Sequence, residues 1–293
     1  MIELRVEELG FQLKKENLSS QEMVLQPSSR ELDNNSNNSV SRTAGRWKYK
    51  KDLAEAFNLY RDEYYEAGAL AKALGGCRLC LDFNQETVSF DHRLCRSKAC
   101  PFCGQFRLRK EQDVLAYLLR EAQQNKDVYG MLTLTVSHTK EMSAKKVLTK
   151  LQKCWSRLNS NKSFHRLVKS YFKAIDYTVT KNGFHYHYHL AIVLRDGVRV
   201  TPAKKELSNL WKAAGGGFIR FNRYDDIHRK SPETVQKGIY EMTSYIGKDQ
   251  KKFSLKKSVE IHCANYRKRM FSYGGEWSGE KLKANRELLA EEK

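Results

Sequence analysis

Residues 184–193 read FHYHYHLAIV, and this alternation is the feature that most restricts the local fold. Successive side chains of a β-strand point to opposite faces. His185, His187 and His189 therefore share one face, whereas the tyrosines and the leucine between and after them take the other. We predict a strand with one face rich in imidazoles.

The run before it, residues 171–180 (YFKAIDYTVT), also favours a strand, and Asn182-Gly183 lies between the two runs. Asn-Gly between two β-rich runs is the strongest short-range signal of a β-hairpin, because both positions tolerate positive φ. We expect this pair to form a two-residue loop in which Lys181 faces Phe184.

That loop brings a carboxylate and two imidazoles together. It places Asp176 opposite His189 and Thr178 opposite His187, and opposed residues share a face with Cβ atoms about 4.5–5.5 Å apart. We expect Asp176, His187 and His189 to bind a divalent ion, Mg²⁺ or Mn²⁺, with positions left open for substrate oxygens. His185, next to the turn, is expected to bind phosphate or orient a ligand. The alternative is that the histidines form the solvated face of a one-sided sheet.

The charge of the chain indicates a polyanionic partner. Lys and Arg outnumber Asp and Glu by 53 to 34, which gives a net charge of +19, and nucleic acid is the first candidate. Basic and aromatic residues are interleaved in 164–173 and 263–273, as in grooves that follow a sugar-phosphate backbone and stack bases on rings. Charge alone leaves open an anionic membrane or a basic surface without a partner.

No apolar run is long enough to span a bilayer, and the acidic N-terminus lacks the basic segment followed by an apolar segment that is typical of a signal peptide. We therefore expect a cytoplasmic protein with no membrane partner. We also expect four parts along the chain. They are a flexible N-terminal tail at 1–45, rich in Ser and Asn from residue 20, a helical and Cys-rich zinc module at 46–125, the main domain at 126–275 and a charged C-terminal tail at 276–293.

The hydrophobic periodicity predicts an α+β fold. Helices are expected over residues 47–74, 105–124, 142–159, 202–214 and 232–248. Strands are expected over residues 129–138, 171–180, 184–193 and 217–222. From residue 129 the order is β-α-β-β-α-β plus a helix. This order predicts a split βαβ (ferredoxin-like) sheet that contains antiparallel strands and has helices on one face, preceded by the small zinc module.

Residues 240–249 (YEMTSYIGKD) place Glu241, Tyr245 and Lys248 on one helix stripe. Beside a metal ion, Tyr245 is a candidate nucleophile for attack on phosphorus, with Lys248 stabilising charge and Glu241 activating a water. Tyr240 falls off this stripe. The alternative is that the stripe is simply the solvated side of a helix.

Three motifs in the chain resemble, in order and spacing, those of plasmid rolling-circle replication initiators (Rep proteins), members of the HUH endonuclease superfamily. They are LTLTVSH (132–138), HYHYHL (185–190) and EMTSYIGKD (241–249). The second motif usually reads His-Pro-His-x-His in that family, and Tyr186 stands here at the proline position. The resemblance covers roughly residues 75–275.

The resemblance implies a metal-dependent nuclease domain over 126–275. His187 and His189 correspond to the metal ligands, and Asp176 stands where the family usually has a glutamate. The single-tyrosine members carry a Glu four residues before the nucleophile, as Glu241 lies before Tyr245.

The resemblance also implies the reaction. Tyr245 would cleave one strand at a rolling-circle origin, retain the 5′-phosphate covalently and free a 3′-hydroxyl for polymerase, with Lys248 beside it. The expected partners are single-stranded or hairpin origin DNA, flanking duplex, and the host helicase and polymerase. The rival hypotheses are a transposase or relaxase of the same superfamily and a non-catalytic zinc-containing DNA-binding regulator.

Five of the seven cysteines lie between residues 77 and 103. Such clustering in a cytoplasmic chain favours Zn²⁺ over disulfides, and the turn Cys-Pro-Phe-Cys at 100–103 is typical of zinc sites. The resemblance to the initiators selects four structural zinc ligands: Cys77, Cys95, Cys100 and Cys103. Cys80 and His92 are the alternates, and buried or redox-active thiols are the other interpretation. Cys154 and Cys263 are expected to be packing residues.

Overall fold

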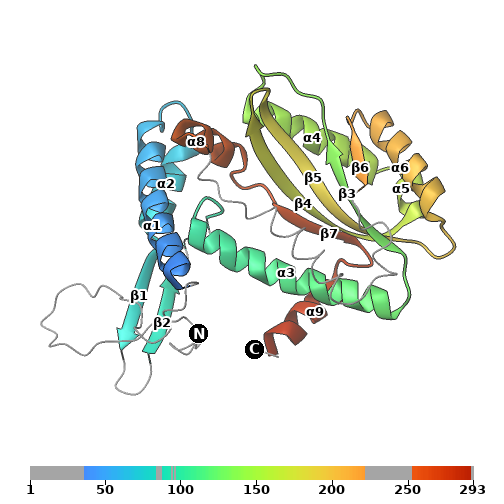
Figure 1. The fold of residues 1–293 in the computed structure, drawn as a ribbon, viewed down its shortest axis with the longest axis horizontal. Helices are drawn as coiled ribbons and strands as arrows, with labels where there is room; N and C mark the ends of the chain where they lie inside the picture. Colours follow the sequence, from blue (N-terminus) through green and yellow to red (C-terminus); the bar gives the residue numbers. More distant parts are fainter. Residues whose placement is uncertain (1–35, 84–87, 94, 96, 222–252, 292–293) are drawn as a thin grey trace, which may run out of the picture. The chain divides into compact units, whose positions relative to one another are not determined.

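The computed structural model describes residues 36–83, 88–93, 95, 97–221 and 253–291 (Figure 1). The chain forms two compact units, Met1–Gly104 and Gln105–Lys293. Within the described ranges, no helix has both the length and the apolar character needed to cross a bilayer.

The first unit is built on two helices, α1 (Ser36–Leu59) and α2 (Ala67–Gly75). Leu53 and Phe57 of α1 and Leu74 of α2 are fully buried, which gives this unit an apolar core of its own. Helix α1 begins inside the Ser- and Asn-rich stretch expected to be a flexible tail, well before the apolar periodicity starts.

A short hairpin follows in the first unit. Strands β1 (Arg78–Phe83) and β2 (Val88–Arg93) pair antiparallel, with Cys80 opposite Asp91. The apolar run after Cys77 is therefore the first strand of a hairpin. The strand β1 leads away from Cys77, and β2 returns towards Cys95.

The second unit is an α+β fold around one five-stranded sheet (Figure 1). Its strands are β3 (Tyr129–Thr135), β4 (Val168–Thr180), β5 (Gly183–Leu194), β6 (Ile219–Phe221) and β7 (Phe271–Gly275). They lie in the order β6-β3-β5-β4-β7, and every neighbouring pair is antiparallel. The first four strands, with the helices after β3 and β5, form the split βαβ arrangement predicted from the sequence.

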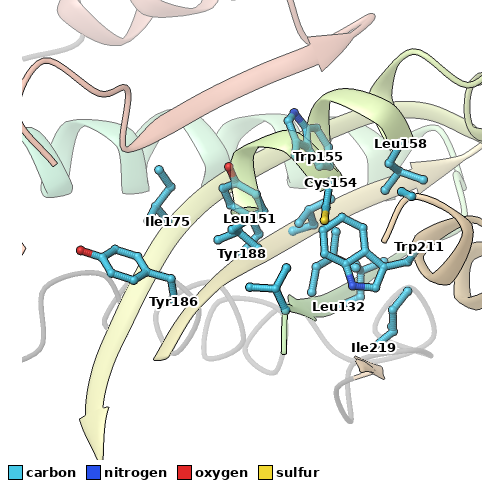
Figure 2. Close-up of a cluster of buried hydrophobic side chains, with 14 of the residues drawn as sticks. Leu132, Leu151, Cys154, Trp155, Leu158, Ile175, Tyr186, Tyr188, Trp211 and Ile219 are labelled. Carbon is cyan, nitrogen blue, oxygen red and sulfur yellow. The ribbon is translucent and has the colours of Figure 1, made fainter. Parts of the chain in front are cut away.

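Four helices contribute to the core on one face of the sheet, as expected. They are α4 (Ala144–Asn159), α5 (Lys162–Leu167), α6 (Val200–Ala213) and α8 (Leu255–Ala264). Helix α4 begins at a Ser143 cap, whose hydroxyl accepts the backbone N–H of Lys146. Figure 2 shows Trp155 of α4, Trp211 of α6 and Tyr188 of β5 in one buried cluster, in which the Trp155 and Tyr188 rings are 5.7 Å apart between centroids. The tyrosine side of the histidine strand therefore faces this core.

Helix α3 (Pro101–Gln124) adds cover to part of the opposite face. Leu115 and Leu118 of α3 are buried in a second cluster with Phe172 of β4 and Ala191 of β5. From the sequence, residues 105–124 are expected to belong to the zinc module. The structure places them in the second unit, because their apolar side chains pack against the sheet.

The C-terminal segment is also part of the second unit and is not a free charged tail. Trp277 is buried in the same cluster as α3, and helix α9 (Glu280–Glu291) follows it. Arg286 of α9 donates to both carboxylate oxygens of Glu111 at 2.9 and 3.1 Å, and the Tyr273 hydroxyl donates to Glu111 at 2.7 Å. The Arg286 bonds hold α9 to α3, and the Tyr273 bond joins β7 (Phe271–Gly275) to α3.

The hairpin between β4 and β5 has a different register from the one expected. Its loop is Lys181-Asn182, and Gly183 already pairs with Thr180. Gly183 has a φ of 95°, which glycine adopts without strain, whereas Asn182 is not among the residues with positive φ. The Asn182 N–H bonds to the Thr180 hydroxyl at 3.1 Å in a local turn. The prediction that Asn-Gly forms the loop was therefore wrong.

In the observed register, the partner of each β4 residue on β5 is two residues away from the expected partner. Asp176 lies opposite His187, Ala174 opposite His189, and Thr178 opposite His185. A shift of one residue would have moved every side chain to the other face, but a shift of two keeps each on its own face. Asp176 therefore still shares a face with the three histidines.

Candidate metal centres

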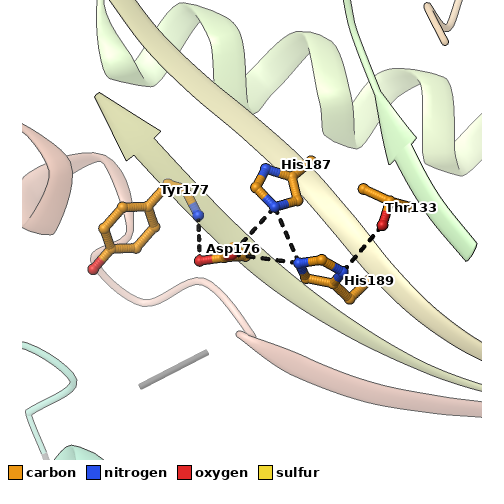
Figure 3. Close-up of polar contacts among 5 residues, drawn as sticks. All are labelled: Thr133, Asp176, Tyr177, His187 and His189. Carbon is orange, nitrogen blue, oxygen red and sulfur yellow. Dashed lines mark hydrogen bonds and ion pairs between the residues drawn. The ribbon is translucent and has the colours of Figure 1, made fainter. Parts of the chain in front are cut away.

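The first candidate site lies on the histidine face of the sheet, where β4 and β5 bring three side chains together (Figure 3). Nε2 of His187 lies 3.1 Å from Nε2 of His189 and 3.1 Å from Oδ2 of Asp176. Nε2 of His189 lies 3.4 Å from the same carboxylate oxygen. These are the three residues predicted as ligands from the sequence, and their ligand atoms converge on one point.

The spacing of these atoms fits a divalent cation. Ligands about 2.1 Å from an ion and at right angles to each other are about 3 Å apart, close to the three distances found here. Two imidazole nitrogens and a carboxylate oxygen on one side of an ion leave its other positions for water or substrate. The donor set therefore suits an ion that also binds a substrate oxygen.

The charge of the cluster is set by Asp176. Burial alone raises the pKa of this carboxyl group, but the hydrogen bonds and charges of His187 and His189 outweigh burial and lower the pKa to about 2. The backbone N–H of Tyr177 also donates to Asp176 Oδ1 at 2.7 Å. Asp176 is therefore an anion at neutral pH, as a metal ligand has to be.

Thr133 of β3 supports the cluster from the neighbouring strand. Its hydroxyl lies 3.2 Å from Nδ1 of His189 (Figure 3). A hydrogen bond at Nδ1 orients the imidazole and fixes which nitrogen carries the proton, so that Nε2 presents its lone pair to the cluster. This role of Thr133 was not predicted from the sequence, where its only signal is its place in the strand expected at 129–138.

The third histidine of the strand lies beside the cluster and not in it. The ring of His185 is 5.2 Å from that of His187 and 5.0 Å from that of His138, measured between centroids. Burial, followed by the charges of His187 and His138, lowers the pKa of His185. His138, which ends the 132–138 motif, had been given no role from the sequence.

The predicted nucleophile and its neighbours fall outside the described residues. Glu241, Tyr245 and Lys248, together with Tyr240, lie within 222–252, where the structure gives no placement. Their roles remain predictions.

The second candidate site is a group of four cysteines in the first unit: Cys77, Cys95, Cys100 and Cys103. The Sγ atom of Cys103 is 3.7 Å from that of Cys77 and 3.4 Å from that of Cys95, and Cys77 is 3.8 Å from Cys100. Four sulfurs at 2.3 Å around a tetrahedral Zn²⁺ are about 3.8 Å apart. The structure therefore brings together the four cysteines selected from the resemblance, in a geometry that fits zinc.

The local backbone explains how these cysteines are positioned. Cys100 and Cys103 lie at the start of α3, where Pro101 occupies the first helical residue and needs no N–H partner. Lys50 of α1 donates to the carbonyl oxygen of Cys77 at 2.7 Å. Hydrogen bonding with Cys100 is the largest influence on Cys103 and raises the pKa of its thiol to about 12. The crowded thiols need a cation to persist as thiolates.

The remaining cysteines differ in what the structure describes. Cys154 and Cys263 are buried in the second unit, as expected of packing residues, and burial raises the pKa of the Cys154 thiol. Cys80 lies on β1 and the alternate His92 on β2, but their side chains lie outside the described part of the structure.

The fold and the two clusters define an α+β protein with two candidate metal centres. The protein family described as "Replication protein" matches residues 87–292, which is more than half of the chain, so the chain belongs to this family. The match includes the Asp176, His187 and His189 cluster and three of the four clustered cysteines. It supports the role of a replication initiator. No curated protein and no solved structure matches the chain.

Proposed function

We propose that the protein initiates rolling-circle replication by nicking one strand of a plasmid-type origin, in the manner of the HUH endonucleases. Family membership supports the replication role. The observation that carries the nuclease proposal is the convergence of Asp176, His187 and His189 on one face of the sheet. A binding regulator has no need of an anionic carboxylate and two imidazoles in this arrangement.

The donor set accommodates Mg²⁺ or Mn²⁺, and such an ion would polarise a phosphodiester of the bound strand. The chain's own residues would do the rest. Asp176 supplies the negative charge, His187 and His189 supply neutral nitrogen ligands, and Thr133 keeps the His189 ring in place.

In this proposal the Tyr245 oxygen attacks phosphorus, forming an O–P bond as the bond from phosphorus to the 3′-oxygen breaks. The phenolic proton leaves Tyr245, and the departing 3′-oxygen takes up a proton, so that a 3′-hydroxyl and a 5′-phosphotyrosine result. Lys248 would stabilise negative charge on the phosphoryl oxygens. Glu241 would later activate the water that releases the DNA.

The free 3′-hydroxyl would serve as the primer for a host polymerase, with a host helicase opening the duplex ahead of it. The cut strand has to be single-stranded or extruded as a hairpin, because in-line attack needs an accessible phosphorus. The cysteine cluster would hold a structural Zn²⁺ that stabilises the first unit, and the basic residues that follow it in α3, Arg107, Arg109 and Lys110, would contact flanking duplex.

The test is the formation of a covalent protein–DNA adduct. The full chain is incubated with Mn²⁺ and short overlapping single-stranded oligonucleotides that tile both strands of the replicon encoding it. We expect one oligonucleotide to give a denaturant-resistant adduct whose DNA carries its 5′-phosphate on the protein.

The matched variants are Tyr245→Phe and Tyr240→Phe. They are matched because each removes one hydroxyl from the same segment. Tyr245→Phe is expected to abolish the adduct, because it removes the proposed nucleophile, and Tyr240→Phe is expected to retain it. The proposal fails if no oligonucleotide yields an adduct, or if Tyr245→Phe forms it as well as the unaltered chain.

A further inference from the structure

The edge strand β6 presents an exposed aromatic ring and a cation close to the Asp176, His187 and His189 cluster. Phe218, immediately before β6, is 68% exposed, and Arg220 within β6 is also exposed. A single exposed aromatic residue is common on protein surfaces. Whether Phe218 belongs to a binding surface depends on which face of the sheet its ring occupies and on how firmly its backbone is held.

The alternation of buried and exposed side chains along residues 218–221 shows which face of the sheet Phe218 and Arg220 occupy. Ile219 is buried in the core beneath α4 and α6, where Figure 2 shows it near Trp211, and Phe221 packs against the same core. Because neighbouring strand residues point to opposite faces, Phe218 and Arg220 point to the histidine face.

The strand pairing then places these two residues in line with the metal cluster. Arg220 lies opposite Thr133, and Thr133 lies opposite His189. Phe218 adjoins Thr135, which lies opposite His187. Adjacent strands are about 4.8 Å apart, and β3 lies between β6 and β5, so the backbone of Phe218 is about 10 Å from the strand that carries the histidines. This distance is within reach of a neighbouring nucleotide of a strand bound at the cluster.

The backbone at Phe218 is held by several hydrogen bonds. Its carbonyl oxygen accepts the Thr135 N–H at 3.1 Å and the Thr135 hydroxyl at 2.9 Å. The Thr135 carbonyl oxygen in turn accepts the Gly217 N–H at 2.8 Å and the Trp211 indole N–H at 2.9 Å. An exposed ring on a fixed backbone loses little conformational entropy when a ligand packs on it.

The glycines before Phe218 are required by this arrangement. A Cβ atom on Gly216 would lie 2.2 Å from the Trp211 ring, and one on Gly217 would lie 3.2–3.3 Å from the backbone of residues 135–137. The Gly-Gly-Gly sequence at 215–217 therefore allows the chain to pass close to Trp211 and β3 and to present Phe218 at the edge.

We propose that Phe218 and Arg220 form a nucleotide-binding subsite for single-stranded DNA, in which a base next to the scissile phosphate stacks on the Phe218 ring while Arg220 contacts the backbone phosphate. The inference rests on the proposed function for the identity of the strand. Base stacking on an aromatic ring tolerates any sequence, and Arg adds charge attraction. The subsite would hold the strand across the sheet, from β6 towards Asp176.

The test measures the binding of fluorescent oligo(dT) to the full chain by anisotropy, without added Mn²⁺ or Mg²⁺, so that cleavage is prevented and the structural zinc is kept. Phe218→Ala is expected to weaken binding about tenfold, and Phe218→Trp to retain it. Arg220→Gln is expected to weaken binding and to reduce the dependence of the log affinity on log salt by about 0.7, the contribution of one phosphate contact to a single strand.

Two controls isolate the stacking. Tyr65→Ala removes another exposed aromatic ring, and Arg199→Gln another exposed cation; both are expected to leave binding unchanged. On an abasic oligonucleotide of the same length, Phe218→Ala is expected to bind as the unaltered chain does, because no base remains to stack.

The subsite is overturned if Phe218→Ala binds oligo(dT) as tightly as the unaltered chain, or if it loses affinity equally for the abasic strand. Circular dichroism checks that each variant is folded. The result is independent of nicking. Loss of stacking without any Tyr245 adduct would overturn the proposed nuclease and leave the subsite standing, and an adduct with unchanged Phe218→Ala binding would do the reverse.

Discussion

At the scale of single residues, the candidate nuclease site depends on contacts behind the ligands as much as on the ligands. Thr133 is one strand away from the histidines, and its hydroxyl is 3.2 Å from His189 Nδ1. Removing such a contact from a metal-binding histidine typically costs ten- to a hundredfold in metal affinity. The effect of Thr133 can therefore be measured without altering a ligand.

We predict that Thr133→Val, which keeps the shape of the side chain and removes its hydroxyl, weakens Mn²⁺ binding by about tenfold. Titration followed by electron paramagnetic resonance of free Mn²⁺ measures the affinity. Thr149→Val, at an exposed position of α4, is the matched control and is expected to change nothing. Equal affinities in the two variants would show that the hydroxyl does not orient His189.

A second residue-scale prediction concerns His262 of α8, which is buried. Burial lowers its pKa from 6.5 to about 4, so the folded chain favours the neutral imidazole. Between these two pKa values the unfolded chain binds more protons than the folded chain. The contribution of His262 to stability is therefore complete above pH 6.5 and is lost as the pH falls towards 4.

The unfolding free energy is expected to fall between pH 7 and pH 5 by about 2 kcal/mol more in the unaltered chain than in His262→Gln. Urea unfolding followed by tryptophan fluorescence measures it, since Trp155, Trp211 and Trp277 are buried in the second unit. Parallel pH profiles of the two proteins would contradict the assignment of a buried neutral imidazole.

At the scale of elements, the β4–β5 hairpin shows what local sequence can and cannot predict. The alternation of residues 184–193 was sufficient to predict the face, because the side-chain period of a strand is two. The register was not predictable from Asn-Gly alone, because the Thr180 hydroxyl bonds to the Asn182 N–H and only Gly183 has positive φ. Asp176 still shares a face with His187 and His189 because the register error was an even number of residues.

The turn makes a prediction of its own. Gly183 and Gly197 both have positive φ, 95° and 77°, but only at Gly183 would a Cβ meet backbone, 3.2 Å from Lys140. Gly197→Ala is expected to cost about 1 kcal/mol from backbone strain, and Gly183→Ala about 2 kcal/mol or more. Urea unfolding of the two variants compares them. Equal losses would mean that the close approach to Lys140 is unimportant.

At the scale of the whole molecule, the sequence predicted the order of elements better than their grouping. Hydrophobic periodicity predicted the helix at 105–124, and mixed charge suggested a tail at 276–293. Neither pattern indicates which other element a segment packs against. The bonds from Arg286 and Tyr273 to Glu111 join residues more than 160 positions apart. Contacts of this kind have no local signature, and the same holds for Phe218, whose place beside the histidines follows only from the pairing of β6 with β3.

The four clustered cysteines give a prediction about the first unit. Cys77→Ser is expected to lose the single bound zinc, and Cys80→Ser to keep it, because the Cys77 sulfur is within 3.8 Å of two others. Elemental analysis after dialysis measures the zinc content. The second unit should retain its fold in both variants, since its cores contain no residue of the zinc cluster. Zinc retained by Cys77→Ser and lost by Cys80→Ser would reverse the choice of ligand.

The central claim is that Asp176, His187 and His189 bind one divalent cation. The most direct measurement is anomalous X-ray diffraction at the manganese edge from crystals of the full chain grown with Mn²⁺. We predict a single strong peak within about 2.3 Å of Asp176 Oδ2 and of the Nε2 atoms of both histidines. An ordered site with no anomalous peak between these three side chains would contradict the claim.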